Sequence, residues 1–172
     1  MVEAKMARAV ARYLRKKGYI TATEVPLYGM RMDIVAYSRS KRLFQVIECK
    51  PTEGDTGIGR AFGQLATYHS SVTDNGFEFL RSASKKLPSM SFRRWMQATH
   101  WARYFEVSYY VALTHGATLK LDLVMGLKKT MPQFGIIRVK PGGGCRSYIY
   151  KSGRMYSDLT TARPQRIKIV KP

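Results

Sequence analysis

The sequence predicts an α/β fold with a mixed central β-sheet flanked by helices. The order of its hydrophobic patterns is one reason: a helical pattern comes first, then three strand-like runs, a helix and a strand. The connections are the other reason. Short links join the first three strand-like runs, as in an antiparallel meander, whereas the later ones follow longer segments, as in crossover connections. A chain of 172 residues buries enough surface for one domain.

The first element is expected to be an amphipathic helix over residues 2–16. Met6, Val10 and Leu14 recur at helical spacing, and the basic residues lie largely off their stripe. Gly18 stands where a helix C-terminal cap is expected. Glu3 shares the apolar face, so two interpretations stay open: it belongs to a functional site, or it is an acid favoured by the helix dipole.

Strands and a helix follow in the order that the apolar runs indicate. A polar turn over 38–42 joins the second and third strands, and a glycine-rich link precedes the next helix. The expected strands cover 19–25, 31–37 and 43–49, and the expected helix covers about 60–71.

The second half is less regular. Asp74-Asn75-Gly76 marks a turn, and the polar sequence after it predicts an inserted or mobile loop over 73–91. The core of the domain is expected within about 1–140, and 141–172 form a basic C-terminal extension of the same domain. Further elements are a helix over 92–105, a strand over 107–113, a helix over 119–129, a strand over 134–139, and edge strands over 146–150 and 166–170.

The net charge points to a polyanionic partner. Thirty Lys and Arg residues against eleven Asp and Glu give +19 and a pI near 10.2. Such an excess favours contacts with the phosphate backbone of DNA or RNA. A basic surface for solubility and attachment to anionic lipid are the alternatives, but no lipidation motif, long apolar run or signal-peptide pattern supports a membrane. An intracellular, cytoplasmic location is expected.

Asp33, Glu48 and Lys50 lie on two adjacent apolar runs, with fourteen residues between the acids. Because strand side chains alternate, Glu48 and Lys50 should share one face, with Cys49 on the other. If Asp33 lies across the ladder on that face, two carboxylates and an ammonium group converge. Such oxygens suit Mg²⁺, with Mn²⁺ expected to substitute, and the backbone carbonyl of Cys49 would add an oxygen. The alternative is an exposed Glu48–Lys50 ion pair without catalytic meaning.

This pattern resembles the PD-(D/E)XK nuclease superfamily, although Met32 stands where a proline often precedes the first acid. The resemblance implies a restriction-endonuclease-like fold with the core order helix-strand-strand-strand-helix-strand. It also implies that Asp33 and Glu48 bind the metal and that Lys50 is the catalytic lysine.

Two further features resemble branches of this superfamily. Gln64-Leu65-Ala66-Thr67-Tyr68 is similar to the Q-x-x-x-Y motif of RecB-like nucleases, which implies that Gln64 and Tyr68 complete the site. Glu3 occupies the position of an additional metal-linked acid in archaeal Holliday-junction resolvases. The alternative for the helical pair is that Tyr68 packs in the core and Gln64 is a solvated surface residue.

These observations predict a Mg²⁺-dependent endo- or exodeoxyribonuclease that hydrolyses phosphodiester bonds. A non-catalytic nucleic-acid-binding protein and an RNA-directed nuclease remain alternatives. Junction resolution would require a homodimer that presents two sites, whereas trimming of ends or single strands would not, and the sequence does not distinguish them.

Overall fold

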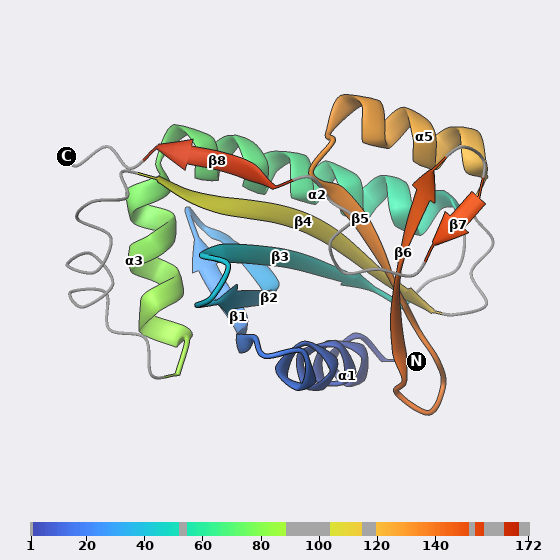
Figure 1. Cartoon of the computed structure of the whole chain (residues 1–172), viewed down its shortest axis with the longest axis horizontal. Coiled ribbons are helices and arrows are strands. Elements are labelled where there is room, and N and C mark those ends of the chain that lie inside the picture. The colour runs from blue at the N-terminus through green and yellow to red at the C-terminus, as the bar shows by residue number, and fades with distance from the viewer. Residues whose placement is uncertain are drawn as a thin grey trace.

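The computed structural model describes residues 2–51, 55–88, 104–114, 120–151, 154–156 and 164–168 (Figure 1). Its helices are α1 (Glu3–Lys16), α2 (Asp55–Asp74), α3 (Gly76–Lys86) and α5 (Leu121–Thr130). Its strands are β1 (Ile20–Leu27), β2 (Met30–Ser38), β3 (Leu43–Lys50), β4 (Tyr104–Thr114), β5 (Phe134–Val139), β6 (Cys145–Lys151), β7 (Arg154–Tyr156) and β8 (Gln165–Lys168).

The described strands form a mixed sheet in the order β1-β2-β3-β4-β5-β6-β7. The first three strands are antiparallel neighbours, whereas β3, β4 and β5 run parallel. β6 returns antiparallel beside β5, and β8 pairs with the first half of β4. The predicted meander and crossovers are therefore confirmed. The strands predicted after residue 140 join the sheet of the core.

Helices cover both faces of this sheet (Figure 1). α1 packs on one face, where Met6, Val10 and Leu14 are fully buried against Ile34 and Ile47 of the strands. α2, α3 and α5 contribute to the larger core on the other face. In the described part of the chain, no helix combines the length and apolarity needed to cross a membrane.

α1 ends next to Gly18, the glycine that the sequence predicts as its C-terminal cap. Gly18 adopts a φ of +86°, in the left-handed region that glycine enters at little cost. Its N–H donates to the carbonyl of Arg15, and the N–H of Tyr19 donates to that of Leu14. These bonds satisfy carbonyl groups of the last turn and bring the chain back toward β1.

A second glycine is required by close packing between two parallel strands. Gly135 on β5 pairs with Tyr110 on β4, and the Tyr110 ring covers the glycine. A Cβ atom at position 135 would clash with Cε1 of that ring. The tyrosine therefore occupies the space that any larger residue would need.

The prediction of an inserted or mobile loop over 73–91 is wrong for its described part. α2 continues to Asp74, and α3 begins at Gly76 after a single residue, Asn75, whose side chain accepts from the N–H of Glu78 at 3.1 Å. The turn signal thus marks a boundary between two helices. Phe79 is fully buried, so the polar segment is amphipathic and packs on the sheet. Residues 89–91 lie outside the described residues.

Two other boundaries differ from prediction. α2 begins at Asp55, so the expected link containing Gly57 and Gly59 is helical. The helix predicted over 92–105 is wrong at its end, because Tyr104 and Phe105 belong to β4; residues 92–103 lie outside the described part.

Candidate active site

The candidate site lies where β2 begins and β3 ends. The antiparallel ladder of β2 and β3 ends at the pair Ile34–Ile47, and Asp33 and Glu48 are the next residues beyond it on the two strands. The N–H of Cys49 donates to Oδ2 of Asp33 over 2.7 Å. This hydrogen bond from the β3 backbone holds the Asp33 carboxylate beside the end of β3.

Glu48 and Lys50 form a close ion pair on one face of β3. Lys50 Nζ donates to Glu48 Oε1 over 2.8 Å. The Glu48 side chain is 2% exposed and that of Lys50 is 19% exposed. Cys49 packs in the α1-side core, on the opposite face. The predicted alternation is confirmed, and the alternative of an exposed ion pair is wrong for Glu48.

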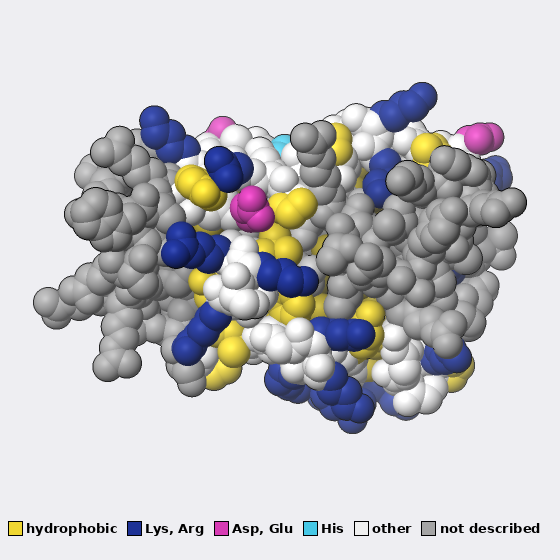
Figure 2. Space-filling model, viewed as in Figure 1, with side chains coloured by type: hydrophobic (Ala, Val, Ile, Leu, Met, Phe, Trp, Pro, Cys, Tyr) yellow, Lys and Arg dark blue, Asp and Glu magenta, His cyan; other side chains and the backbone are white. Residues whose placement is uncertain are grey.

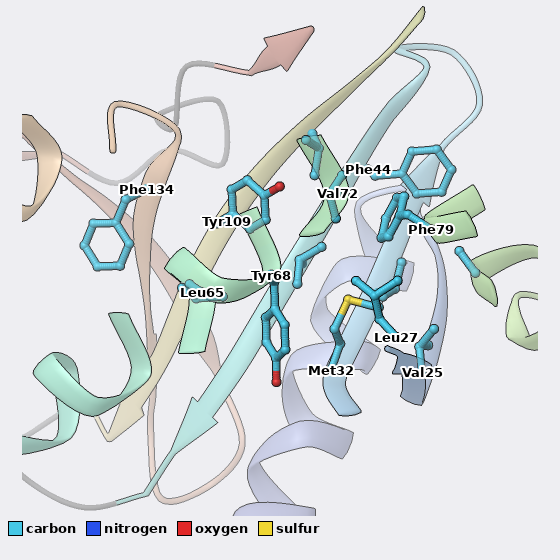
Figure 3. Packing of buried hydrophobic residues seen from close by; sticks show 14 of the residues in the cluster. Val25, Leu27, Met32, Phe44, Leu65, Tyr68, Val72, Phe79, Tyr109 and Phe134 are labelled. Atoms are coloured by element: carbon cyan, nitrogen blue, oxygen red, sulfur yellow. The ribbon is translucent and has the colours of Figure 1, made fainter. Parts of the chain in front are cut away.

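Tyr68 reaches the same carboxylate from α2. Its ring is buried in the larger core beside Leu65, and its hydroxyl group points out of the apolar cluster (Figure 3). The hydroxyl donates to the carbonyl oxygen of Arg31 at 2.8 Å, and its oxygen lies 3.4 Å from Glu48 Oε2. Tyr68 therefore both packs in the core and contacts the site.

A cavity of about 340 Å³ joins the predicted residues. All the side chains predicted to act line it: Asp33, Glu48, Lys50, Gln64, Tyr68 and Glu3. Gln64 is exposed one turn before Tyr68, and Glu3 is exposed at the start of α1. The interpretation that Glu3 lies along the buried side of α1 is therefore wrong, although its side chain still borders the cavity.

Arg31 and Thr67 also line this cavity, and neither was predicted from the sequence. Each was detectable from spacing. Arg31 is two residues before Asp33, so the two share a strand face. Thr67 follows Gln64 by three residues, so they neighbour each other on a helix.

Burial raises the pKa of both acids. It raises the pKa of Glu48 to about 6, and the nearby charge of Asp33 acts in the same direction against the Lys50 hydrogen bond. Burial also raises the pKa of Asp33, although the Cys49 N–H opposes it. Burial alone would lower the pKa of Lys50, but its hydrogen bond to Glu48 and the surrounding negative charges outweigh burial and raise it.

The donor chemistry of the cavity fits a hard divalent cation. Two carboxylates meet there, and burial raises the pKa of both because it disfavours their charged forms. A bound cation would stabilise those charged forms. Within the described ranges, no three His, Cys, Asp or Glu residues are grouped to hold a metal ion together. Mg²⁺ needs only one or two carboxylates because it retains water. Ligation by Glu3 and by the Cys49 carbonyl stays a prediction.

The described residues thus define a mixed α/β protein with a buried acid–lysine site at the end of a parallel strand. A scan of family models finds no match, and a search of curated proteins finds none either.

Among solved structures, the chain is similar to a repair endonuclease from Pyrococcus abyssi, with a TM-score of 0.50 and 15% identity. The similarity covers 82% of this chain and 48% of that one, so this chain spans about half the length of the endonuclease. The likeness confirms the predicted fold class, a restriction-endonuclease-like sheet flanked by helices.

Proposed function

We propose that this protein is a metal-dependent nuclease that hydrolyses phosphodiester bonds in DNA. The observation that carries the proposal is the convergence of Asp33, Glu48 and Lys50 with Gln64 and Tyr68 on one cavity. The fold of a repair endonuclease and a net charge of +19 support it from independent directions. The residue pattern also resembles that of PD-(D/E)XK nucleases.

Asp33 and Glu48 would hold the metal, with Mg²⁺ as the expected ion and Mn²⁺ as a substitute. When bound, such a cation supplies Lewis-acid chemistry at the scissile phosphate. Asp33 is already held by the Cys49 N–H, so one carboxylate is oriented before any ion binds. Tyr68 contacts Glu48 Oε2 and restrains the second carboxylate.

Lys50 would act as a cation in this site. Its raised pKa keeps the proton on Nζ at neutral pH, so the group donates hydrogen bonds. An ammonium group here can orient the attacking water and stabilise the negative charge that develops on phosphate. The exposed Gln64 amide, which also lines the cavity, can donate to a phosphate oxygen.

The direct test is incubation of the purified protein with plasmid, linear single-stranded and four-way-junction DNA, with Mg²⁺ and with a chelator. The proposal predicts cleavage of at least one substrate that needs the divalent cation. Binding of all three without cutting would support a non-catalytic nucleic-acid-binding protein. RNA substrates of matched sequence are incubated in parallel, and cutting restricted to them would redirect the proposal to an RNA nuclease.

A further inference from the structure

A second hollow adjoins the candidate site. A groove of about 610 Å³ runs between the start of α1 and the β1–β2 hairpin. Glu3, Arg31 and Asp33 line both this groove and the catalytic cavity. The two hollows therefore adjoin at these residues, so a nucleic-acid strand seated in the cavity lies next to the groove.

Two arginines supply positive charge along this groove. Three acids share the groove lining, and two of them, Glu3 and Asp33, also border the candidate metal site. Arg8 on α1 and Arg31 on β2 line the groove from opposite sides, and both are exposed. Arg31 pairs with Glu24 at 3.4 Å, where the side chains are 63% and 66% exposed. An ion pair this exposed is weak, so a phosphate can replace the carboxylate as partner of Arg31.

Further basic residues continue from Arg8 along the outside of α1. Lys5, Arg12, Arg15 and Lys16 are all exposed, and their three- and four-residue spacing places them along one side of the helix. Figure 2 shows Lys and Arg side chains gathered along the lower edge of the molecule, where Figure 1 places α1. The 14-residue helix is about 21 Å long, so the charge extends well beyond the cavity.

We infer that the groove and the basic side of α1 form the track for the nucleic-acid backbone on one side of the scissile phosphate. Arg8 and Arg31 bind phosphates next to the site, and Glu24 competes with phosphate for Arg31. This inference rests on the proposed function for the position of the scissile phosphate. It adds the direction in which the substrate leaves the cavity and two residues that position it.

The Glu24–Arg31 pair has a matched control on α3. Arg81 and Glu78 also form an ion pair, at 2.9 Å, and neither lines the cavity or the groove. The substitutions Arg31→Gln and Arg81→Gln lower the net charge equally, and Glu24→Gln and Glu78→Gln raise it equally. A difference in DNA affinity between the two variants of a matched pair therefore depends on where the substituted residue lies and not on the net charge.

The experiment measures binding of the full chain to a fluorescein-labelled DNA duplex over a salt series without divalent cations. Arg31→Gln and Arg8→Gln should each weaken binding about tenfold. Each should also reduce the slope of log K against log salt by about 0.9, the value for one phosphate contact. Glu24→Gln should tighten binding about threefold, while both α3 variants stay near wild type apart from the small effect of charge.

Equal effects of the groove and α3 variants would overturn the track, because net charge alone would then explain binding. Unchanged binding in Arg8→Gln and Arg31→Gln would overturn it as well. The cleavage assay is run in parallel to keep the two proposals separate. A protein that binds through the groove but cuts no DNA refutes the nuclease and keeps the track. A protein that cuts DNA while its groove variants bind as their controls do refutes the track and keeps the nuclease.

Discussion

Lys50 donates to Oε1 of Glu48 over 2.8 Å, two residues away on the same strand. The acid is almost fully buried, so both charges have given up much of their hydration. A buried pair of this kind is weak evidence for stability, because packed apolar residues often serve as well or better. Its presence at a cavity with a second acid, Asp33, fits a role in chemistry more readily than a role in folding.

Asp33→Asn should separate metal binding from folding. The Asn side-chain oxygen can still accept from the Cys49 N–H, so the local structure should survive. The charge is lost, and calorimetric titration should show Mn²⁺ binding weakened at least about tenfold. Asp122→Asn, an exposed acid on α5, is the control and should bind as wild type does. Equal Mn²⁺ affinity in Asp33→Asn and wild type would exclude Asp33 as a ligand.

Glu48→Gln should remove a pH-dependent loss of stability from the metal-free protein. The folded-state pKa of Glu48 is raised from 4.5 to about 6, so the folded state holds this proton more tightly than the unfolded state. Wild-type stability therefore falls as pH rises through that window, by about 2 kcal/mol at most. The variant lacks this loss. Urea unfolding below pH 4.5 and above pH 6 measures it. A stability difference between the two proteins that does not change with pH would contradict the assignment.

Tyr68→Phe should slow DNA cleavage while lowering the free energy of unfolding only slightly. The variant keeps the buried ring but removes the hydroxyl that contacts Arg31 and Glu48. Loss of one hydrogen bond costs about 1 kcal/mol. Tyr19→Phe is the matched control, since its hydroxyl accepts from Gln45 at 3.4 Å and does not line the cavity. Both variants should unfold at similar urea concentrations, and only Tyr68→Phe should cut more slowly. Equal cleavage rates would assign Tyr68 to packing alone.

Gly135→Ala tests the packing between β4 and β5. A methyl group would meet the Tyr110 ring, and overpacking of this kind costs about 1–3 kcal/mol. Gly126→Ala on α5 is the control, because nothing lies within 4 Å of its added Cβ atom. Alanine inside a helix should stabilise by about 0.5–1 kcal/mol. Thermal unfolding should therefore shift in opposite directions, and a Gly135→Ala variant as stable as wild type would contradict the packing described.

The strands were predictable because β-branched runs and short connections leave few alternatives. The start of α2 was not, because glycine disfavours helices and the segment reads as a link. Burial of Ile58 and Ala61 against the sheet compensates for that cost, and such tertiary packing is invisible in a local pattern. The same holds for α3, whose polar residues concealed the buried Phe79 and Leu80.

Part of the candidate site could be predicted from the sequence by simple rules of strand geometry. Strand alternation alone places Glu48 and Lys50 on one face. The position of Asp33 follows from the hairpin register, which the length of the 38–42 turn restricts. The groove beside Arg8 could not be foreseen, because it depends on how α1 crosses the β1–β2 hairpin. That placement is set by the packing of α1 against the sheet, which a local sequence pattern does not show.

The most direct test of the account is the Mg²⁺-dependent cleavage rate of Lys50→Ala compared with Lys86→Ala, an exposed lysine at the end of α3. Both variants lose one positive charge. If Lys50 acts in cleavage, Lys50→Ala should cut at least about a hundredfold more slowly than wild type. Its binding to DNA should be nearly retained. Lys86→Ala should cut at the wild-type rate. Undiminished cutting by Lys50→Ala would contradict the assignment of this cavity as the active site.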